Sequence, residues 1–127
     1  MWTSVLAISL GASIGALIRW GLAIWLNGMF PNLPPGTLVA NVVGGYLVGV
    51  AFVIFGHYAA WPAEWRLFVI TGFLGGLTTF STFSAEVVHA MQSGRLYWAG
   101  AIVSLHLAGS LVATFAGIAS ASWWVRR

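Results

Sequence analysis

The stretch TGFLGGLTTFSTFSAE, residues 71–86, decides the fold, because it places the double glycine Gly75-Gly76 and a run of hydroxyl side chains inside an apolar segment of helical length. Glycine costs about 1 kcal/mol relative to alanine in a helix interior, and serine and threonine offer the backbone alternative hydrogen-bond partners. We therefore expect the helix to be broken here. Non-helical backbone at membrane depth is tolerated only where it is buried in protein or lines a polar cavity, so we favour a polar lining over a simple kink.

The composition around this stretch is that of a membrane protein. Of the 127 residues, 60% are hydrophobic and 6% are charged, whereas a soluble domain is about 25% charged. Asp, Glu, Lys and Arg are absent from residues 1–18, 20–63, 67–85 and 96–125, and a spanning helix needs only about 20 apolar residues. Turn formers and prolines at residues 27–36 interrupt the second run. We expect one all-α membrane domain, residues 1–127, with spans at about 3–26, 36–56, 65–92 and 97–124.

The few arginines do not set an orientation in the membrane. One side of a four-span chain collects Arg66, Arg126 and Arg127, and the other collects Arg95 and, if it snorkels that way, Arg19. This difference is too small for the positive-inside rule to decide between the two orientations. A chain that inserts both ways can form an antiparallel homodimer with a twofold axis in the membrane plane. Because four short helices enclose little volume, we expect a pore to need two chains.

Glycines recur four residues apart in three of the predicted spans. The pairs are Gly11 and Gly15, Gly45 and Gly49, and Gly72 and Gly76. Such spacing lets helix backbones approach closely where lipid provides no hydrophobic drive for association. We interpret these glycines as contact surfaces between helices.

Two kinds of side chain within the predicted spans suit a small anion. Phe80 and Phe83 lie three residues apart and share a helix face, and the positive edge of a benzene ring can flank an anion without trapping it. On composition alone such a pair is more typical of core packing. Asn41, in the second span, offers two amide donors and is a candidate because it is polar within the membrane. Hydrogen bonding to a neighbouring helix explains it equally well.

The fourth span carries a polar stripe. His106, Ser110 and Thr114 follow one another at intervals of four residues, which places them on one face of a helix. Neutral donors can replace the water that an anion loses, and the lack of a full positive charge allows the ion to leave again. We expect Arg19 to snorkel or to pair rather than to line a site, and Glu86 to be a partly solvated vestibule residue.

No pattern of an enzyme is present. The chain has no paired carboxylates, no zinc-binding His-Glu-x-x-His helix, no Gly-x-Ser-x-Gly and no phosphate loop. It has no cysteine, which excludes disulfides and thiolate metal sites. The net charge is only +3 and the chain has no lysine, so we expect no nucleic-acid partner. We expect no catalytic residues.

Two strings carry a family resemblance: GTLVANVVGG at residues 36–45 and GFLGGLTTFSTFSAE at residues 72–86. Together they closely resemble the small bacterial fluoride channels of the Fluc type, also called CrcB-like. The resemblance covers nearly the whole chain in length and number of spans. It implies a passive fluoride-selective channel of the bacterial cytoplasmic (inner) membrane, which exports cytoplasmic fluoride and confers fluoride resistance. It also implies a dual-topology antiparallel homodimer with two fluoride pathways.

The resemblance also implies roles for particular residues. The positions that match the family's pathway are Asn41, Phe80 and Phe83, followed by the polar track of Ser110 and Thr114. Some members carry a tyrosine one turn before His106, where this chain has Ile102, so His106 could replace part of that track. The family holds a central sodium ion on backbone carbonyls, and the matching positions are Gly75 and Thr78.

Two other functions fit a four-span chain of this size. A small dual-topology multidrug or cation transporter needs an ionisable acid within the membrane to exchange protons for its substrate, and the first span has none. A non-conducting membrane assembly protein would use the polar groups only to join helices, and it would show no ion flux.

Overall fold

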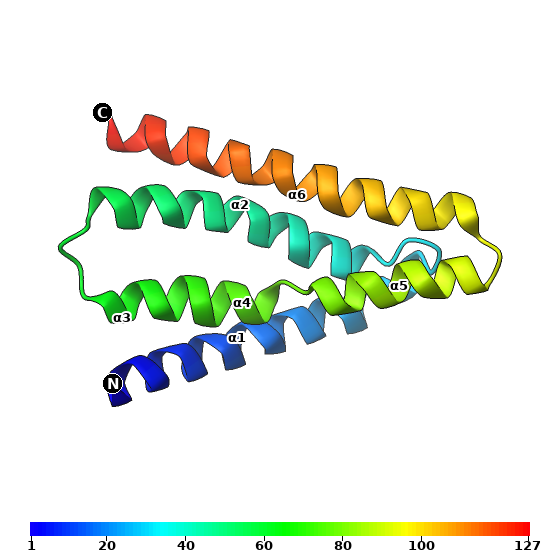
Figure 1. Cartoon of the computed structure of the whole chain (residues 1–127), viewed down its shortest axis with the longest axis horizontal. Helices are drawn as coiled ribbons and strands as arrows, with labels where there is room; N and C mark the ends of the chain where they lie inside the picture. The colour runs from blue at the N-terminus through cyan, green and yellow to red at the C-terminus, as the bar shows by residue number, and fades with distance from the viewer.

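The computed structural model describes all residues from Met1 to Arg127 and contains helices but no strands. Its elements are α1 (Trp2–Leu26), η1 (Asn27–Met29), α2 (Pro35–His57), α3 (Ala63–Arg66), η2 (Leu67–Leu74), α4 (Gly75–Leu77), α5 (Phe80–Gln92) and α6 (Leu96–Val125). They form four rods that lie side by side, of which α3, η2, α4 and α5 make up the third (Figure 1). All four rods are long and apolar enough to cross a membrane, which confirms the prediction of an all-α chain with four membrane helices.

The two chain termini lie at the same end of the bundle, together with the connection between α2 and α3 (Figure 1). The other two connections lie at the opposite end. The shortest rod has 23 residues, and at 1.5 Å per residue it is about 34 Å long. Each rod is therefore long enough for a hydrocarbon core of about 30 Å.

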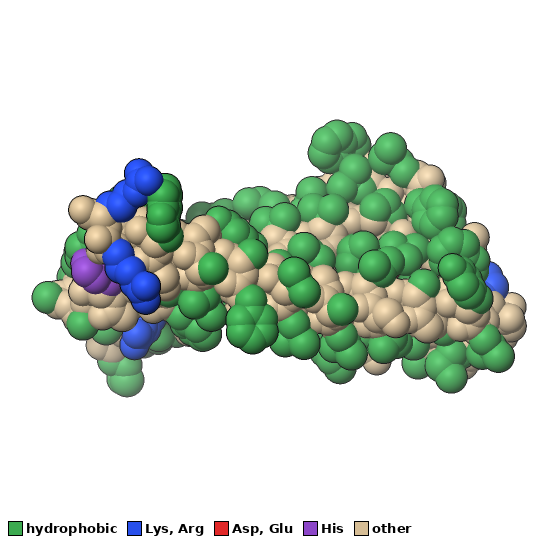
Figure 2. Space-filling model, turned by 90° about the horizontal axis from the view of Figure 1, so that it is seen from above, with side chains coloured by type: hydrophobic (Ala, Val, Ile, Leu, Met, Phe, Trp, Pro, Cys, Tyr) green, Lys and Arg blue, Asp and Glu red, His purple; other side chains and the backbone are tan.

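Large apolar side chains cover the outside of the bundle. Only 20 of the 127 residues are buried, whereas Trp2 on α1 and Phe115 on α6 are 79% and 73% exposed. Figure 2 shows hydrophobic side chains along the length of the molecule and arginines gathered at its two ends. A surface of this kind would aggregate in water, and it matches lipid in the middle and headgroups at the ends.

Glycines permit the closest helix contacts. α1 packs along η2 and α4, and α2 packs along α6. A Cβ atom added at Gly15 would lie 2.7 Å from the backbone nitrogen of Leu77, and one added at Gly49 would lie 3.0 Å from that of Ile118. The glycine pairs predicted to be contact surfaces lie at these crossings.

The connections at the end opposite the termini are held by polar contacts. Asn27 Oδ1 accepts hydrogen bonds from the backbone nitrogens of Gly36 at 2.8 Å and Thr37 at 3.2 Å, which satisfies free amides at the start of α2. Between α5 and α6 the chain turns at Gly94, whose φ of 76° suits glycine. Arg95 Nη1 donates to Asn32 Oδ1 at 2.8 Å, and this bond joins the two connections.

The third rod changes its backbone conformation near its middle. η2 is a π-helical segment, and α4 continues to Leu77. The backbone is then extended at Thr78, with φ −86° and ψ 154°, and at Thr79, with φ −149° and ψ 118°. α5 begins at Phe80, and Thr79 caps it by accepting a hydrogen bond from the backbone nitrogen of Thr82 at 3.1 Å.

Candidate anion site

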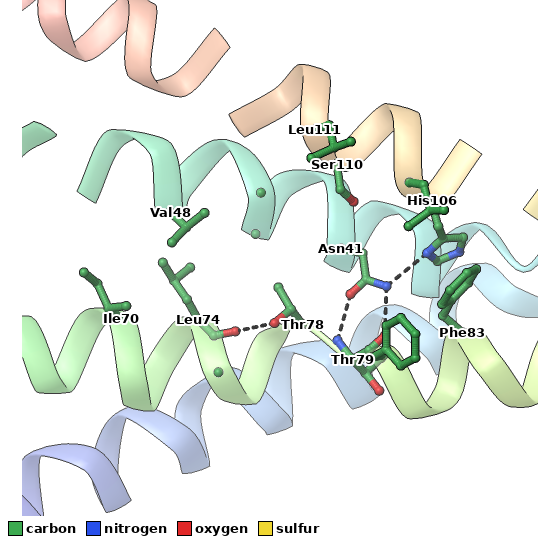
Figure 3. Close-up of a pocket in the computed structure, with 15 residues that line it drawn as sticks. Asn41, Val48, Ile70, Leu74, Thr78, Thr79, Phe83, His106, Ser110 and Leu111 are labelled. Atoms are coloured by element: carbon green, nitrogen blue, oxygen red, sulfur yellow. Dashed lines mark hydrogen bonds between the residues drawn. The ribbon is translucent and has the colours of Figure 1, made fainter. Parts of the chain in front are cut away.

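A cavity of about 470 Å³ lies where the extended residues of the third rod face α2 and α6 (Figure 3). The residues proposed from the sequence that line it are Asn41, Gly75, Thr78, Phe80, Phe83, His106 and Ser110. Thr114 does not line it. Its lining includes no arginine, lysine, aspartate or glutamate. The cavity is therefore bounded by apolar side chains and uncharged polar groups.

Asn41 reaches from α2 to the extended backbone. Its Oδ1 accepts from the backbone nitrogen of Thr79 at 2.7 Å, and its Nδ2 donates to the carbonyl oxygen of Thr79 at 3.0 Å. These two bonds fix which end of the side-chain amide is oxygen and which is nitrogen. Nδ2 also lies 3.0 Å from His106 Nδ1 on α6 (Figure 3). Asn41 thus ties three rods together, and both of its amide hydrogens have partners within the chain.

Aromatic rings form the wall beside Asn41. The ring of His106 stacks on that of Phe83, with centroids 4.6 Å apart and planes at 29°. Phe80 meets Phe83 edge to face at 5.5 Å and 73°. Phe83 and His106 are buried, whereas Phe80 is 76% exposed. The ring of Phe80 therefore stands at the open side of the cavity in the single chain.

Carbonyls at the end of α4 and at Thr78 lack their usual helical donors. The backbone nitrogen of Thr79, which would bond the carbonyl of Gly75 in a continuous helix, bonds Asn41 instead. The backbone nitrogen of Thr82, which would bond the carbonyl of Thr78, bonds the Thr79 hydroxyl.

The carbonyl of Gly76 has found a substitute donor. Arg19 Nε on α1 donates to it at 2.9 Å. Arg19 thus pairs with the backbone rather than lining the cavity, in agreement with the expectation that it would snorkel or pair.

The hydroxyl stripe on α6 divides into two parts. Thr114 Oγ1 lies 3.0 Å from the carbonyl of Gly45 and 2.9 Å from that of Ser110, four residues before it. Its hydroxyl therefore serves helix packing in this structure. The Ser110 hydroxyl lines the cavity and makes no hydrogen bond within the chain (Figure 3). Ser110 is thus the free neutral donor of the stripe.

Glu86 lies on α5, one turn beyond Phe83, and does not line the cavity. One of its oxygens accepts from the Thr37 hydroxyl at 2.5 Å, and the other is buried without a partner. Thr37 in turn accepts from Asn27 Nδ2 at 3.4 Å. No local motif marks Thr37 or Asn27 in the sequence, because Thr37 meets Glu86, and Asn27 meets Thr37, only through the packing of α2 against α5 and η1.

The same holds for Thr79, whose backbone is the main partner of Asn41 although the two residues lie 38 positions apart. Thr79 stands in the run of hydroxyls at residues 78–84, and that run was the only signal for it in the sequence. Chemically, the assembled site offers a hydroxyl, an amide and aromatic rings in an uncharged, largely apolar wall. Such a wall can replace part of the hydration shell of a small anion without holding it as a fixed positive charge would.

Comparison with known proteins gives one consistent family. Residues 6–118 match the family described as "CrcB-like protein, Camphor Resistance (CrcB)". The chain is 56% identical to a protein of Nitrosomonas europaea over 98% of both chains. It is 60% identical to a protein of Tolumonas auensis over 96% of both, and 54% identical to one of Pseudomonas paraeruginosa over the whole of both. All three relatives are named fluoride-specific ion channel FluC.

Proposed function

Because the chain belongs to the CrcB-like family, we propose that it is a fluoride-specific ion channel and that fluoride passes through the cavity beside Asn41. The protein is a multi-pass protein of the bacterial inner membrane and is a channel rather than an enzyme. The observation that carries the proposed pathway is the lining of the cavity, which has neutral polar groups and aromatic rings but no charged side chain. The multidrug transporter is not favoured, since α1 has no acidic residue.

The cavity residues would act in sequence on a dehydrating ion. The Ser110 hydroxyl, which has no partner in the chain, would donate to fluoride directly. The exposed ring of Phe80 would present its positive edge, and Phe83 would do the same deeper in the wall. Transport would be passive, because an inside-negative potential favours exit of a single negative charge by about 2.3 kcal/mol per 100 mV. Export of cytoplasmic fluoride by this route would confer resistance to it.

A second, antiparallel copy of the chain would close the site. Phe80 is 76% exposed although it lines the cavity, so a single chain leaves the pathway open on one side. The chain has no cysteine, which allows the orientation to be tested with the single substitutions R95C and R127C at opposite ends. In inside-out vesicles a membrane-impermeant maleimide should label about half of each variant if both orientations occur. Complete labelling of one variant and none of the other would exclude dual topology.

The carbonyls of Gly75 and Thr78 would hold the sodium ion. Both have lost their helical amide donors, and hard cations prefer oxygen ligands of this kind. An antiparallel pair of chains would bring two such carbonyls from each chain, and the extended residues Thr78 and Thr79 would be the functional break in the third helix. The ion would supply a fixed charge that joins the two chains. Preparing the protein with N-methylglucamine in place of sodium should reduce both dimer content and fluoride flux, and no change in either would remove sodium from the account.

The phenylalanines provide the test of this pathway. We expect F83I and F80I each to lower fluoride flux about tenfold or more, because an aliphatic side chain of similar bulk lacks the positive ring edge. The measurement is fluoride efflux from proteoliposomes with a fluoride-selective electrode, beside empty vesicles.

F115I is the matched control, since Phe115 is 73% exposed on α6 and lies outside the cavity. Wild-type flux in both F80I and F83I would mean that the rings serve packing alone and that fluoride takes another route.

A further inference from the structure

The hydrogen bonds of Asn41 determine the state of His106. The backbone of Thr79 fixes the Asn41 amide, so that Nδ2, the nitrogen, faces the imidazole at 3.0 Å. A nitrogen that carries hydrogens can only donate, and His106 Nδ1 must therefore accept. The imidazole is then neutral and carries its proton on Nε2. The stacking on Phe83, at 4.6 Å between centroids, holds the ring in this position.

This arrangement leaves fluoride no free hydrogen on Asn41. One hydrogen of Nδ2 bonds the carbonyl of Thr79, and the other bonds His106 Nδ1. The bond to Thr79 is one of a pair that holds the extended backbone. The bond to His106 is single and runs between two side chains that line the cavity, so it is the one that an arriving ion would exchange.

We propose that His106 is a positioning residue whose Nδ1 is a replaceable acceptor, which holds the Asn41 amide between ions and yields it when fluoride arrives. A buried donor is never left without a partner, either before the ion binds or after it leaves. The acceptor competes with fluoride and so weakens its binding at this position. Conduction needs binding weak enough for the ion to leave, so this competition would speed release. The inference rests on the proposed function, because it assumes that fluoride reaches Asn41.

Three substitutions separate the two imidazole nitrogens and the ring. H106F keeps a flat ring against Phe83 and removes both nitrogens. In H106N the side-chain amide lies near the position of Nδ1 and its oxygen can accept from Asn41. In H106Q the amide reaches the position of Nε2 and leaves that of Nδ1 empty. Initial efflux rates from proteoliposomes, measured over a range of fluoride concentrations, give a half-saturating concentration and a maximal rate for each variant.

For H106F and H106Q we expect the half-saturating concentration to fall about fivefold and the maximal rate to fall by a similar factor, the size of one neutral hydrogen bond. H106N should restore both values to near those of the wild type. A residue that only supports the fold would lower the maximal rate without tightening binding, and H106N would not rescue it. Either of those results would overturn the inference.

A spectroscopic measurement separates this inference from the proposed function. The chain has three asparagines, so an NMR spectrum of protein labelled with ¹⁵N-asparagine shows few side-chain amide signals. The Asn41 signal should shift in H106F and stay in place in H106N without any fluoride present. If the wild-type protein does not conduct fluoride but the Asn41 signal behaves as expected in the two variants, the proposed function is wrong, whereas the hydrogen bond between Asn41 and His106 is confirmed. An Asn41 signal that H106F leaves unmoved would overturn the inference even in a conducting channel.

Discussion

Replacing Asn41 by Asp is expected to lower fluoride flux at least about a hundredfold. The new carboxylate can still accept from the backbone nitrogen of Thr79, but its second oxygen would face the carbonyl of Thr79 and His106 Nδ1, which are both acceptors now served by Nδ2. A carboxylate about 4 Å from the ion would repel it by about 4 kcal/mol at an effective dielectric constant near 20. That energy corresponds to a factor of about a thousand in flux. We expect the smaller decrease of about a hundredfold because water entering the cavity would screen part of the repulsion.

The matched control adds the same charge elsewhere. Asn32 lies in the connection between α1 and α2, and its Oδ1 accepts from Arg95 Nη1 at 2.8 Å. In N32D the new carboxylate would pair with that guanidinium, so we expect nearly wild-type flux. Normal flux in a folded N41D protein would show that Asn41 joins helices and does not meet the ion.

The second large effect is expected at Gly15, which lies where α1 crosses the third rod. A Cβ atom there would lie 2.7 Å from the backbone nitrogen of Leu77 and would also meet the carbonyl oxygen of Phe73. Because both are backbone atoms, the helices must separate, and overpacking of this kind costs about 1–3 kcal/mol or more. We expect G15A to unfold or aggregate in detergent where the wild-type protein is monodisperse. Thermal unfolding and size-exclusion chromatography measure this.

Gly21 provides the control on the same helix. A Cβ atom at Gly21 meets nothing within 4 Å, and alanine is the better helix former by about 1 kcal/mol. G21A should therefore be at least as stable as the wild-type protein. Equal stability of G15A and G21A would mean that the backbones of α1 and the third rod are farther apart at Gly15 than in this structure.

The four membrane helices could be predicted because they depend on composition alone. A charge-free run long enough to cross lipid has few other stable conformations, since every backbone polar group must be satisfied within the segment. The prolines and turn formers at residues 27–36 then separate α1 from α2. The role of the glycine pairs could also be predicted, because the close approach of two helix backbones requires residues without large side chains.

Local detail in the third rod follows the hydroxyl residues more than the glycines. Gly75 keeps helical angles, with φ −62° and ψ −37°, whereas the extended backbone falls at Thr78 and Thr79. Thr79 supplies its own side chain as the cap of α5. Asn41 supplies the partners that the extended backbone of Thr79 needs. Glycine only lowers helix stability, while these side chains offer a competing set of bonds.

Contacts between distant residues could not be predicted. Asn41 and His106 lie 65 positions apart, and nothing in either neighbourhood indicates that one accepts from the other. The sequence also does not predict which acceptor a serine or threonine hydroxyl will bond. Ser110 and Thr114 share a helix face, yet Ser110 lines the cavity while Thr114 bonds the carbonyls of Gly45 and Ser110. Within the membrane, a hydroxyl bonds the acceptor that helix packing places nearest to it. That packing depends on the whole bundle and not on the local sequence.

The most direct test of the central claim is selectivity in vesicles that contain only the purified protein. Proteoliposomes loaded with equal fluoride and chloride, with a potassium gradient and valinomycin to carry the counter-charge, are followed with electrodes selective for each ion. The account predicts rapid loss of fluoride while chloride stays at the level of empty vesicles. Loss of both ions at similar rates, or retention of fluoride as in empty vesicles, would contradict it.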